Sequence, residues 1–219
     1  MRLITCESNI LEAAEDMRYL LERFYDRQVA LSIVCKKYKI NKLQQKLLFN
    51  GVYDDKNAYI NRSKLTNEKN LIDANLNLDL YNVASIINSG LLSEILLFAD
   101  DGYLRNINNI YNKNNINLIE YALEVCFVTI FYLKIKSVKV FLDPKINKND
   151  VFSKIINTKM KKMNINGNIK YSKIENASFP NNQIVVSSNS NVIQNAKYIF
   201  DLPHFIFKKS MEIKSYSLK

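Results

Sequence analysis

Hydrophobic positions in the first third of the chain recur at the three- and four-residue spacing of amphipathic helices. This spacing predicts one helix over residues 9–24, a second over 27–38, and a third from Asn41, which can cap it, to about Asn50. A short turn over residues 39–41 joins the second helix to the third. Two short helices joined by a tight turn are typical of a helix-turn-helix. We therefore expect residues 1–66 to form a helical, helix-turn-helix-like module.

The pattern changes near residue 73, where short apolar runs begin to alternate with helical segments. The apolar runs predict strands at residues 76–81, 94–99, 138–142, 169–171, 184–186 and 198–200. Helices are predicted between them, at residues 83–89, 117–135, 150–163 and 190–196. Strands that alternate with helices predict a parallel sheet flanked by helices. We therefore expect an α/β domain over residues 67–207, followed by a flexible tail over residues 208–219.

The composition is that of an ordinary globular protein, with 47% hydrophobic and 24% charged residues. No apolar run is long enough to span a bilayer, and the N-terminus lacks the apolar block of a secretory signal. The three cysteines, Cys6, Cys35 and Cys126, are far apart and include no Cys-x-x-Cys pair. These features predict a cytoplasmic protein with reduced thiols, no membrane association and no structural zinc site.

The net charge of +10 is unevenly distributed along the chain. Residues 27–64 carry 9 basic and 2 acidic side chains, and residues 151–219 carry 11 and 3, whereas residues 67–150 carry 8 and 10. An acidic middle segment between two basic segments is the pattern expected of a protein that binds a polyanion. In such a protein Lys and Arg bind the phosphates, and the carboxylates bind a cation beside them. The alternative is that these lysines are ordinary solvated surface residues. The candidate phosphate-binding side chains are Lys36, Lys37, Lys42, Lys46, Arg62 and Lys64.

Acidic side chains follow three of the predicted strands. Asp79, the pair Asp100 and Asp101, and Asp143 each come directly after an apolar run. Because the carboxyl ends of parallel strands meet at one edge of a sheet, we expect these acids to converge there. Carboxylate oxygens are the preferred ligands of Mg²⁺ and Mn²⁺, and such ions activate phosphodiester bonds. The alternative is that each Asp caps the turn or helix after its strand.

Other catalytic schemes find little support in the sequence. His204 is the single histidine, which excludes a multi-histidine metal site, and it stands beside Pro203 and Phe205, where a structural role is expected. No nucleophile-elbow motif accompanies it. The chain has four glycines and no glycine-rich phosphate loop, so P-loop NTPases, kinases and dinucleotide enzymes are excluded.

Several motifs resemble an uncharacterised, mainly archaeal family, the domain of unknown function number 434. They run through nearly the whole chain: Ala13-Ala14-Glu15-Asp16-Met17-Arg18, Ala30-Leu31, Arg62-Ser63-Lys64, Asp79-Leu80-Tyr81-Asn82-Val83, Ala99-Asp100-Asp101-Gly102, Phe141-Leu142-Asp143 and Phe200-Asp201-Leu202-Pro203. The C-terminal part is also similar to PIN/NYN-like nuclease domains. That similarity implies a PIN-like (Rossmann-like) parallel sheet in which strand-end acids bind Mg²⁺ or Mn²⁺ and cut RNA.

The chain departs from this pattern at three positions. Leu80 stands where the family-like motif has glycine, Asn106 stands where an acid is expected, and the common Ser-Asp-Ser turn appears as Ser188-Asn189-Ser190. Asparagine can ligate a metal through its carbonyl oxygen, but it brings no charge. The loss of two acids therefore favours a rival in which the same fold binds nucleic acid without cutting it.

We thus expect an Mg²⁺- or Mn²⁺-dependent endoribonuclease-like protein that acts on RNA. The two alternatives are a non-catalytic RNA- or DNA-binding protein and a module in which the helices bind a protein partner. In the first case Asp79, Asp101 and Asp143 would bind the metal, and Asn82 and Asn189 would orient ligands or water. Adjacent residues on an extended chain point in opposite directions, so only one of Asp100 and Asp101 is expected to face the metal. We expect Asp101 to be this ligand, and Asp100 to take its place if Asp101 points away.

Overall fold

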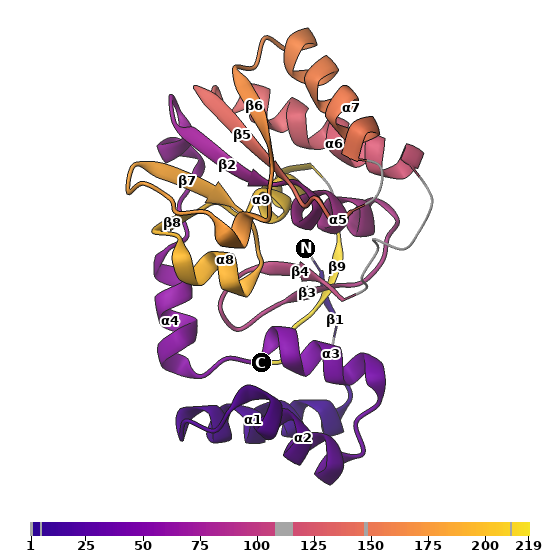
Figure 1. Ribbon diagram of the computed structural model, residues 1–219. Helices are drawn as coiled ribbons and strands as arrows, with labels where there is room; N and C mark the ends of the chain where they lie inside the picture. Colours follow the sequence, from indigo (N-terminus) through magenta and orange to yellow (C-terminus); the bar gives the residue numbers. More distant parts are fainter. Residues whose placement is uncertain (1, 5, 108–115, 147–148, 211) are drawn as a thin grey trace.

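The N-terminal third is helical, as predicted. The computed structural model describes residues 2–4, 6–107, 116–146, 149–210 and 212–219. After the short strand β1 (Arg2–Ile4) come four helices: α1 (Ser8–Glu22), α2 (Arg27–Tyr38), α3 (Lys42–Gly51) and α4 (Asp55–Ser63). The sequence predicts the first three of these helices, and neither β1 nor α4 is predicted. The Asp26 side chain caps α2, and Asn41 forms a capping box with Gln44 at the start of α3. The first three helices enclose a small apolar core and lie at the bottom of Figure 1.

A five-stranded parallel sheet forms the centre of the α/β region, which confirms the predicted architecture. Its strand order is β6 (Gly167–Tyr171), β5 (Ser137–Leu142), β2 (Asn75–Asp79), β7 (Gln183–Val186) and β8 (Tyr198–Ile199). Every neighbouring pair is parallel. The helices around it are α5 (Leu80–Leu91), α6 (Ile116–Tyr132), α7 (Asn149–Lys162), α8 (Ser190–Asn195) and α9 (Leu202–Ser210).

Both faces of this sheet are covered. Leu78, Val140 and Val186 belong to the main core, which α5, α6, α7 and α9 complete. Phe141 and Val185, one residue along their strands, belong to a smaller core under α8 and the short 3₁₀ helix η3 (Ile174–Asn176). Alternate residues of a strand point to opposite faces, which is why neighbouring residues enter different cores.

The order of the strands reverses beside β2. From β2 the chain proceeds outward to β5 and then β6, and it returns to the other side of β2 to form β7 and β8. The connection that leaves the carboxyl end of β2 therefore runs toward β5, and the one that leaves β7 runs the other way, toward β8. The place between β2 and β7 is a topological switch point. In open α/β sheets, such a point is the usual place for a ligand.

A second, four-stranded sheet corrects two sequence-based predictions. It contains β1 (Arg2–Ile4), β9 (Lys214–Tyr216), β3 (Leu96–Phe98) and β4 (Leu104–Asn106), in that order. The strand predicted at 94–99 thus lies outside the parallel sheet, and β3 pairs antiparallel with β4. The expected flexible tail over residues 208–219 is also wrong, because β9 pairs with both β1 and β3 and buries Ser215 completely.

The helical module contacts the sheets through α4 and the segment that follows it. Leu65 forms a parallel bridge with Ile199 of β8, and the backbone N–H of Ile199 donates to the Lys64 carbonyl at 2.8 Å. In the part of the chain that the structure describes, no helix is both long enough and apolar enough to cross a membrane.

Candidate functional site

A large cleft lies between the helical module and the carboxyl edge of the parallel sheet. Its volume is about 1190 Å³. One wall comes from the end of α1 and from α3, with Phe24, Tyr25 and Lys46 among its side chains. The opposite wall comes from the ends of β2 and β5, where Asp79 and Asp143 stand. Residues of η3 and of the turn before α8 complete that wall, so the switch point of the sheet opens into the cleft.

Asp79 lies at the switch point itself. Its Oδ2 atom accepts a hydrogen bond from Ser187 Oγ at 2.7 Å, which joins the ends of β2 and β7. The pKa of the Asp79 carboxyl is raised to about 6, mainly by burial. The charges of Glu175 and Asp143 contribute to this rise, and hydrogen bonds from Ser187 and from the Asn82 backbone oppose it. A carboxylate that is held at a raised pKa among other acids is a common property of functional sites.

The two predicted asparagines also lie in the cleft and fix its floor. Asn82 Oδ1 accepts hydrogen bonds from the Ser188 backbone N–H at 2.8 Å and from Ser188 Oγ at 3.2 Å. Asn189 caps α8 by accepting from the Asn191 N–H at 3.0 Å, and its Nδ2 donates to Glu175 Oε1 at 2.6 Å. The turn over residues 187–189 is therefore hydrogen-bonded to Asn82 at the start of α5 and to Glu175 on η3.

Asp143 and Glu175 complete the acidic part of the cleft. Asp143 Oδ1 accepts from the Lys145 N–H at 2.9 Å, and its Oδ2 lies 3.9 Å from Lys173 Nζ. Glu175 lies on η3 and is a functional candidate that the sequence reasoning misses. It follows no apolar strand, so its local sequence gives no signal; the fold alone brings it beside Asn189.

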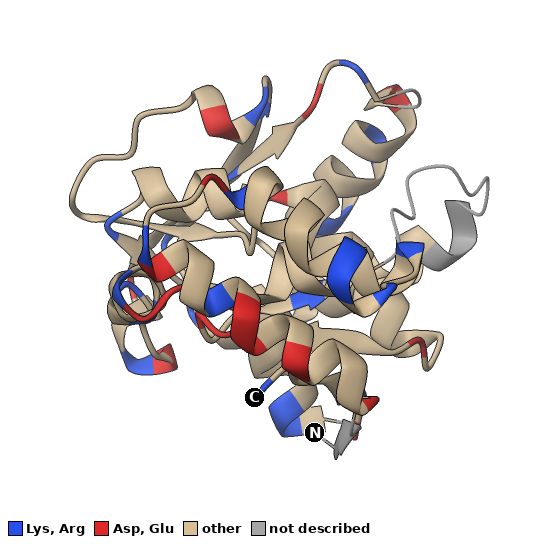
Figure 2. Ribbon diagram, turned by 90° about the horizontal axis from the view of Figure 1, so that it is seen from below, with Lys and Arg blue, Asp and Glu red and all other residues tan. Residues whose placement is uncertain are grey.

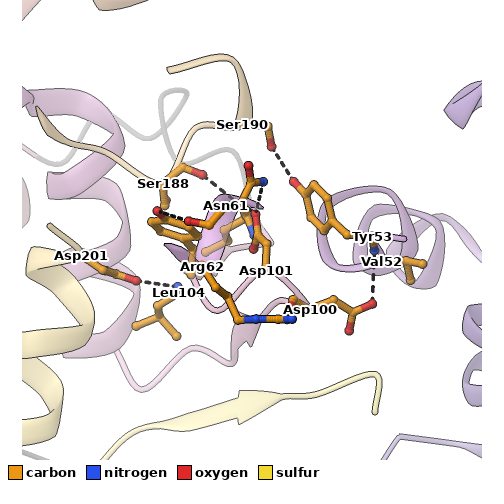
Figure 3. A network of polar contacts seen from close by, with 12 residues as sticks. Val52, Tyr53, Asn61, Arg62, Asp100, Asp101, Leu104, Ser188, Ser190 and Asp201 are labelled. Carbon is orange, nitrogen blue, oxygen red and sulfur yellow. Dashed lines mark hydrogen bonds and ion pairs between the residues drawn. The ribbon is translucent and has the colours of Figure 1, made fainter. Parts of the chain in front are cut away.

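Asp100 and Asp101 lie elsewhere, beside Tyr53 and Asn61 (Figure 3), and each is bound to an arginine. Arg18 donates to the two Asp100 oxygens at 2.7 and 3.1 Å. Arg105 donates to the two Asp101 oxygens at 2.6 and 2.7 Å, and Asn61 Nδ2 donates to Oδ2 at 3.1 Å. Because β3 belongs to the second sheet, the structure does not bring these two acids together with Asp79.

The six basic residues proposed to bind phosphate are scattered, and all six lie in the described part of the chain. Of them, Lys46 lines the cleft. Lys64 Nζ donates to the carbonyls of Ile193 and Gln194 at 2.7 and 2.9 Å, at the end of α8. Lys64 and the other four lie outside the cleft lining. Lys37 pairs with Asp16, Arg62 donates to the Asp100 carbonyl, and Lys36 and Lys42 are exposed on α2 and α3.

The donor set fits an open divalent-cation site. Among the described residues, no group of three or more acids, histidines and cysteines is close enough together to enclose a metal ion. Mg²⁺, however, is usually held by one or two carboxylates and completed by water and substrate phosphate. Asp79 and Asp143, at the ends of adjacent strands β2 and β5, supply carboxylates for a site of that kind.

The charges around the helical module do not form one continuous basic face. Figure 2, which views the molecule from below, shows Lys and Arg positions interspersed with Asp and Glu positions along the described ribbon. Any attraction for a polyanion therefore depends on the cations that line the cleft, Arg27, Lys46, Arg105 and Lys173, and on the overall charge of +10.

Comparison with known proteins divides the chain into two parts. Residues 9–64 match the family described as "Protein of unknown function (DUF434)", so the resemblance to that family covers the helical module and not nearly the whole chain. Residues 68–205 match a second family. An uncharacterised protein of Methanocaldococcus jannaschii is 29% identical over 198 residues, which are 89% of this chain and 94% of that protein. No solved structure matches. Because the second family match spans more than half of the 219 residues, the chain belongs to the family described as "Domain of unknown function (DUF5616)".

Proposed function

We propose that this protein hydrolyses phosphodiester bonds of RNA with the help of a divalent cation, in the cleft at the switch point, on a PIN-like fold. One observation carries the proposal. Asp79, Asp143 and Glu175 come from three separate segments and line the same cleft, and the charges of Asp143 and Glu175 add to the burial that raises the pKa of Asp79. Placing acids together costs free energy in the absence of a cation, and a bound cation offsets that cost.

The acids of the cleft and their hydrogen-bond partners have separate roles in this proposal. Asp79 and Asp143 hold the cation, and Ser187 keeps the Asp79 carboxylate oriented through its 2.7 Å hydrogen bond. When bound, Mg²⁺ or Mn²⁺ supplies activation of water and charge neutralisation at the scissile phosphate. Glu175 accepts a proton or orients water, since Asn189 Nδ2 fixes one of its oxygens at 2.6 Å.

The second candidate is an RNA-binding protein that does not cut. Asn106 and Asn189 stand at positions where PIN-like domains have acids, and Asn106 Nδ2 donates to Ser85 Oγ at 3.1 Å inside the cleft. Fewer carboxylates weaken the hold on a divalent cation. This candidate keeps the cleft as a binding site and removes the hydrolytic step.

A cleavage assay separates the two candidates. End-labelled RNAs of mixed sequence are incubated with the wild type, Asp79→Asn and Asp143→Asn, in Mg²⁺, in Mn²⁺ and in EDTA. Asp150→Asn is the matched control, because Asp150 is an exposed carboxylate at the start of α7 and outside the cleft lining. We expect cleavage by the wild type and the control, and its loss in both cleft variants and in EDTA. RNA binding without cleavage in either ion would support the second candidate.

A further inference from the structure

The wall of the cleft that faces the acids carries two exposed aromatic rings. Phe24 is 91% exposed and Tyr25 is 48% exposed, and both line the cleft at the end of α1. An isolated exposed aromatic residue on a surface is common. Two consecutive ones that line a cleft containing carboxylates form a surface suited to stacking on flat rings. We call Phe24 and Tyr25 the aromatic shelf.

The backbone under this shelf is unusual for a phenylalanine. The N–H groups of Phe24 and Tyr25 donate to the carbonyls of Leu21 and Leu20 at 3.0 and 3.2 Å, which is the hydrogen-bond pattern of a Schellman motif. In that motif Phe24 holds the left-handed position, with φ of 63°. Glycine is the usual residue there, and a bulky side chain is strained. Nothing in the packing requires the ring, because it is almost fully exposed.

Cations line both walls of the cleft that contains the shelf. The Lys46 ammonium on α3 makes no hydrogen bond or ion pair with any described residue, and it lines the cleft. On the opposite wall, Lys173 Nζ lies 3.9 Å from Asp143 Oδ2. Arg27 adds a third positive charge, fixed by hydrogen bonds from its Nη1 to the carbonyls of Phe49 and Val52 at 2.8 and 2.7 Å. This combination of aromatic rings and cations is typical of grooves that bind single-stranded nucleic acid.

The size of the cleft also favours a chain over a small molecule. Its volume of about 1190 Å³ exceeds the roughly 300–1,000 Å³ of small-molecule sites. A base inside a duplex has both faces covered by its neighbours in the stack, so an aromatic ring can stack only on an unpaired base. The shelf therefore discriminates between single strands and duplexes.

We infer that the cleft takes single-stranded RNA, with an unpaired base stacked on the aromatic shelf of Phe24 and Tyr25 and the adjoining phosphates between Lys46 and Lys173. The inference rests on the proposed function, which places the reacting phosphate beside the acids. The helical module contributes the residues that recognise the unpaired base. The N-terminal module thus selects the strand that the acidic wall receives.

A stacking assay tests the shelf directly. A short single-stranded RNA that carries one 2-aminopurine is titrated with the wild type in EDTA at low salt, and the same strand annealed to its complement is titrated in parallel. We expect tighter binding of the single strand, with quenching of the 2-aminopurine fluorescence by stacking. Phe24→Ala and Tyr25→Ala should each weaken binding about 5- to 100-fold and reduce the quenching. Tyr132→Ala, on an exposed ring of α6 outside the cleft, is the matched control.

Phe24→Gly separates binding from folding. Glycine relieves the backbone strain at φ of 63°, so the variant should unfold at a higher temperature than the wild type while it binds RNA more weakly. Phe24→Tyr keeps a ring and should retain affinity. Equal binding of single strand and duplex, or unchanged binding and quenching in the alanine variants, would overturn the inference.

The outcomes also distinguish this inference from the proposed function. If the wild type binds single strands through the shelf but never cleaves them in Mg²⁺ or Mn²⁺, the hydrolytic function is wrong and the shelf stands. If Phe24→Ala and Tyr25→Ala bind and cleave like the wild type, the shelf is wrong and hydrolysis stands. If neither single strand nor duplex binds at low salt, both are wrong, and the aromatic rings serve another kind of partner.

Discussion

The guanidinium of Arg105 binds the Asp101 carboxylate through two parallel hydrogen bonds, from Nη1 to Oδ1 at 2.6 Å and from Nη2 to Oδ2 at 2.7 Å. Arg105 Nε donates to the Ser188 carbonyl at 3.0 Å, and the Ser188 N–H donates to Asn82 Oδ1. This buried pair therefore connects the turn after β3 to the floor of the cleft. Its role is to position the turn over residues 187–189, since every nitrogen of the guanidinium already has a partner.

Asp101→Asn is expected to destabilise the fold strongly. The substitution leaves the buried positive charge of Arg105 without its counterion, and breaking such a pair from one side costs about 3–5 kcal/mol. Urea denaturation measures the free energy of unfolding. Asp16→Asn is the control, because the pair of Asp16 with Lys37 is exposed to solvent and contributes little. A free energy for Asp101→Asn equal to that of the control would contradict this assignment.

Asp79→Asn is expected to stabilise the protein at neutral pH. The carboxyl of Asp79 has a pKa raised to about 6 by burial, from an ordinary value near 4. A raised pKa in the folded state means that the stability due to protonated Asp79 is fully present below pH 4 and is lost as the pH rises through about 6. At pH 7 the ionised side chain thus costs about 3 kcal/mol, at about 1.4 kcal/mol for each unit of pKa, and asparagine removes this cost.

Denaturation of the wild type and Asp79→Asn between pH 4 and pH 8 measures this difference. The advantage of the variant should be absent near pH 4, grow up to about pH 6 and stay constant above it. Asp150→Asn, at an exposed position, should follow the wild type throughout. An advantage that does not change with pH would show that burial and charge at Asp79 are not its cause.

Mn²⁺ is expected to stabilise the wild type and not Asp79→Asn. A ligand that binds the folded state alone adds about 2.7 kcal/mol at a concentration one hundred times its Kd. In thermal denaturation, the unfolding midpoint of the wild type should therefore rise with Mn²⁺ and return to its starting value with EDTA. Asp150→Asn should rise like the wild type. An equal rise in Asp79→Asn would place the cation elsewhere.

Much of the fold could be predicted from the sequence because its helices and strands are locally patterned. The first three helices of the N-terminal module and the strands β2, β5 and β7 could be predicted from their apolar patterns, and Asn41 marks the start of α3. The strand near residue 96 shows the limit of this method. Its local pattern predicts a strand but does not reveal which sheet it joins, and so Asp100 and Asp101 could not be separated from Asp79 in advance.

Only some of the residues of the cleft could be predicted from the sequence. Asp79 and Asp143 end neighbouring parallel strands, so their shared edge follows from topology. Glu175 lies on a short 3₁₀ helix, and Phe24 lies at a helix end, and neither position is marked by a period or a motif. The approach of Phe24 to the acids depends on how the helical module packs against the sheet, and the place of Glu175 depends on how η3 packs beside Asn189. Both are tertiary properties.

Deletion of residues 213–219 is expected to destabilise the whole protein, although a tail of this composition could be taken for a dispensable end. Ile213 and Leu218 are 4% and 2% exposed, and burial of each side chain contributes about 1.5–3 kcal/mol. Arg18 Nη2 also donates to the Leu218 carbonyl at 2.5 Å, so the deletion removes a partner of the arginine that binds Asp100. Urea denaturation should therefore show a loss of about 3–6 kcal/mol.

Deletion of the exposed Lys219 alone is the control and should change little. A truncated protein as stable as this control would mean that the pairing of β9 with β1 and β3 adds nothing to the fold.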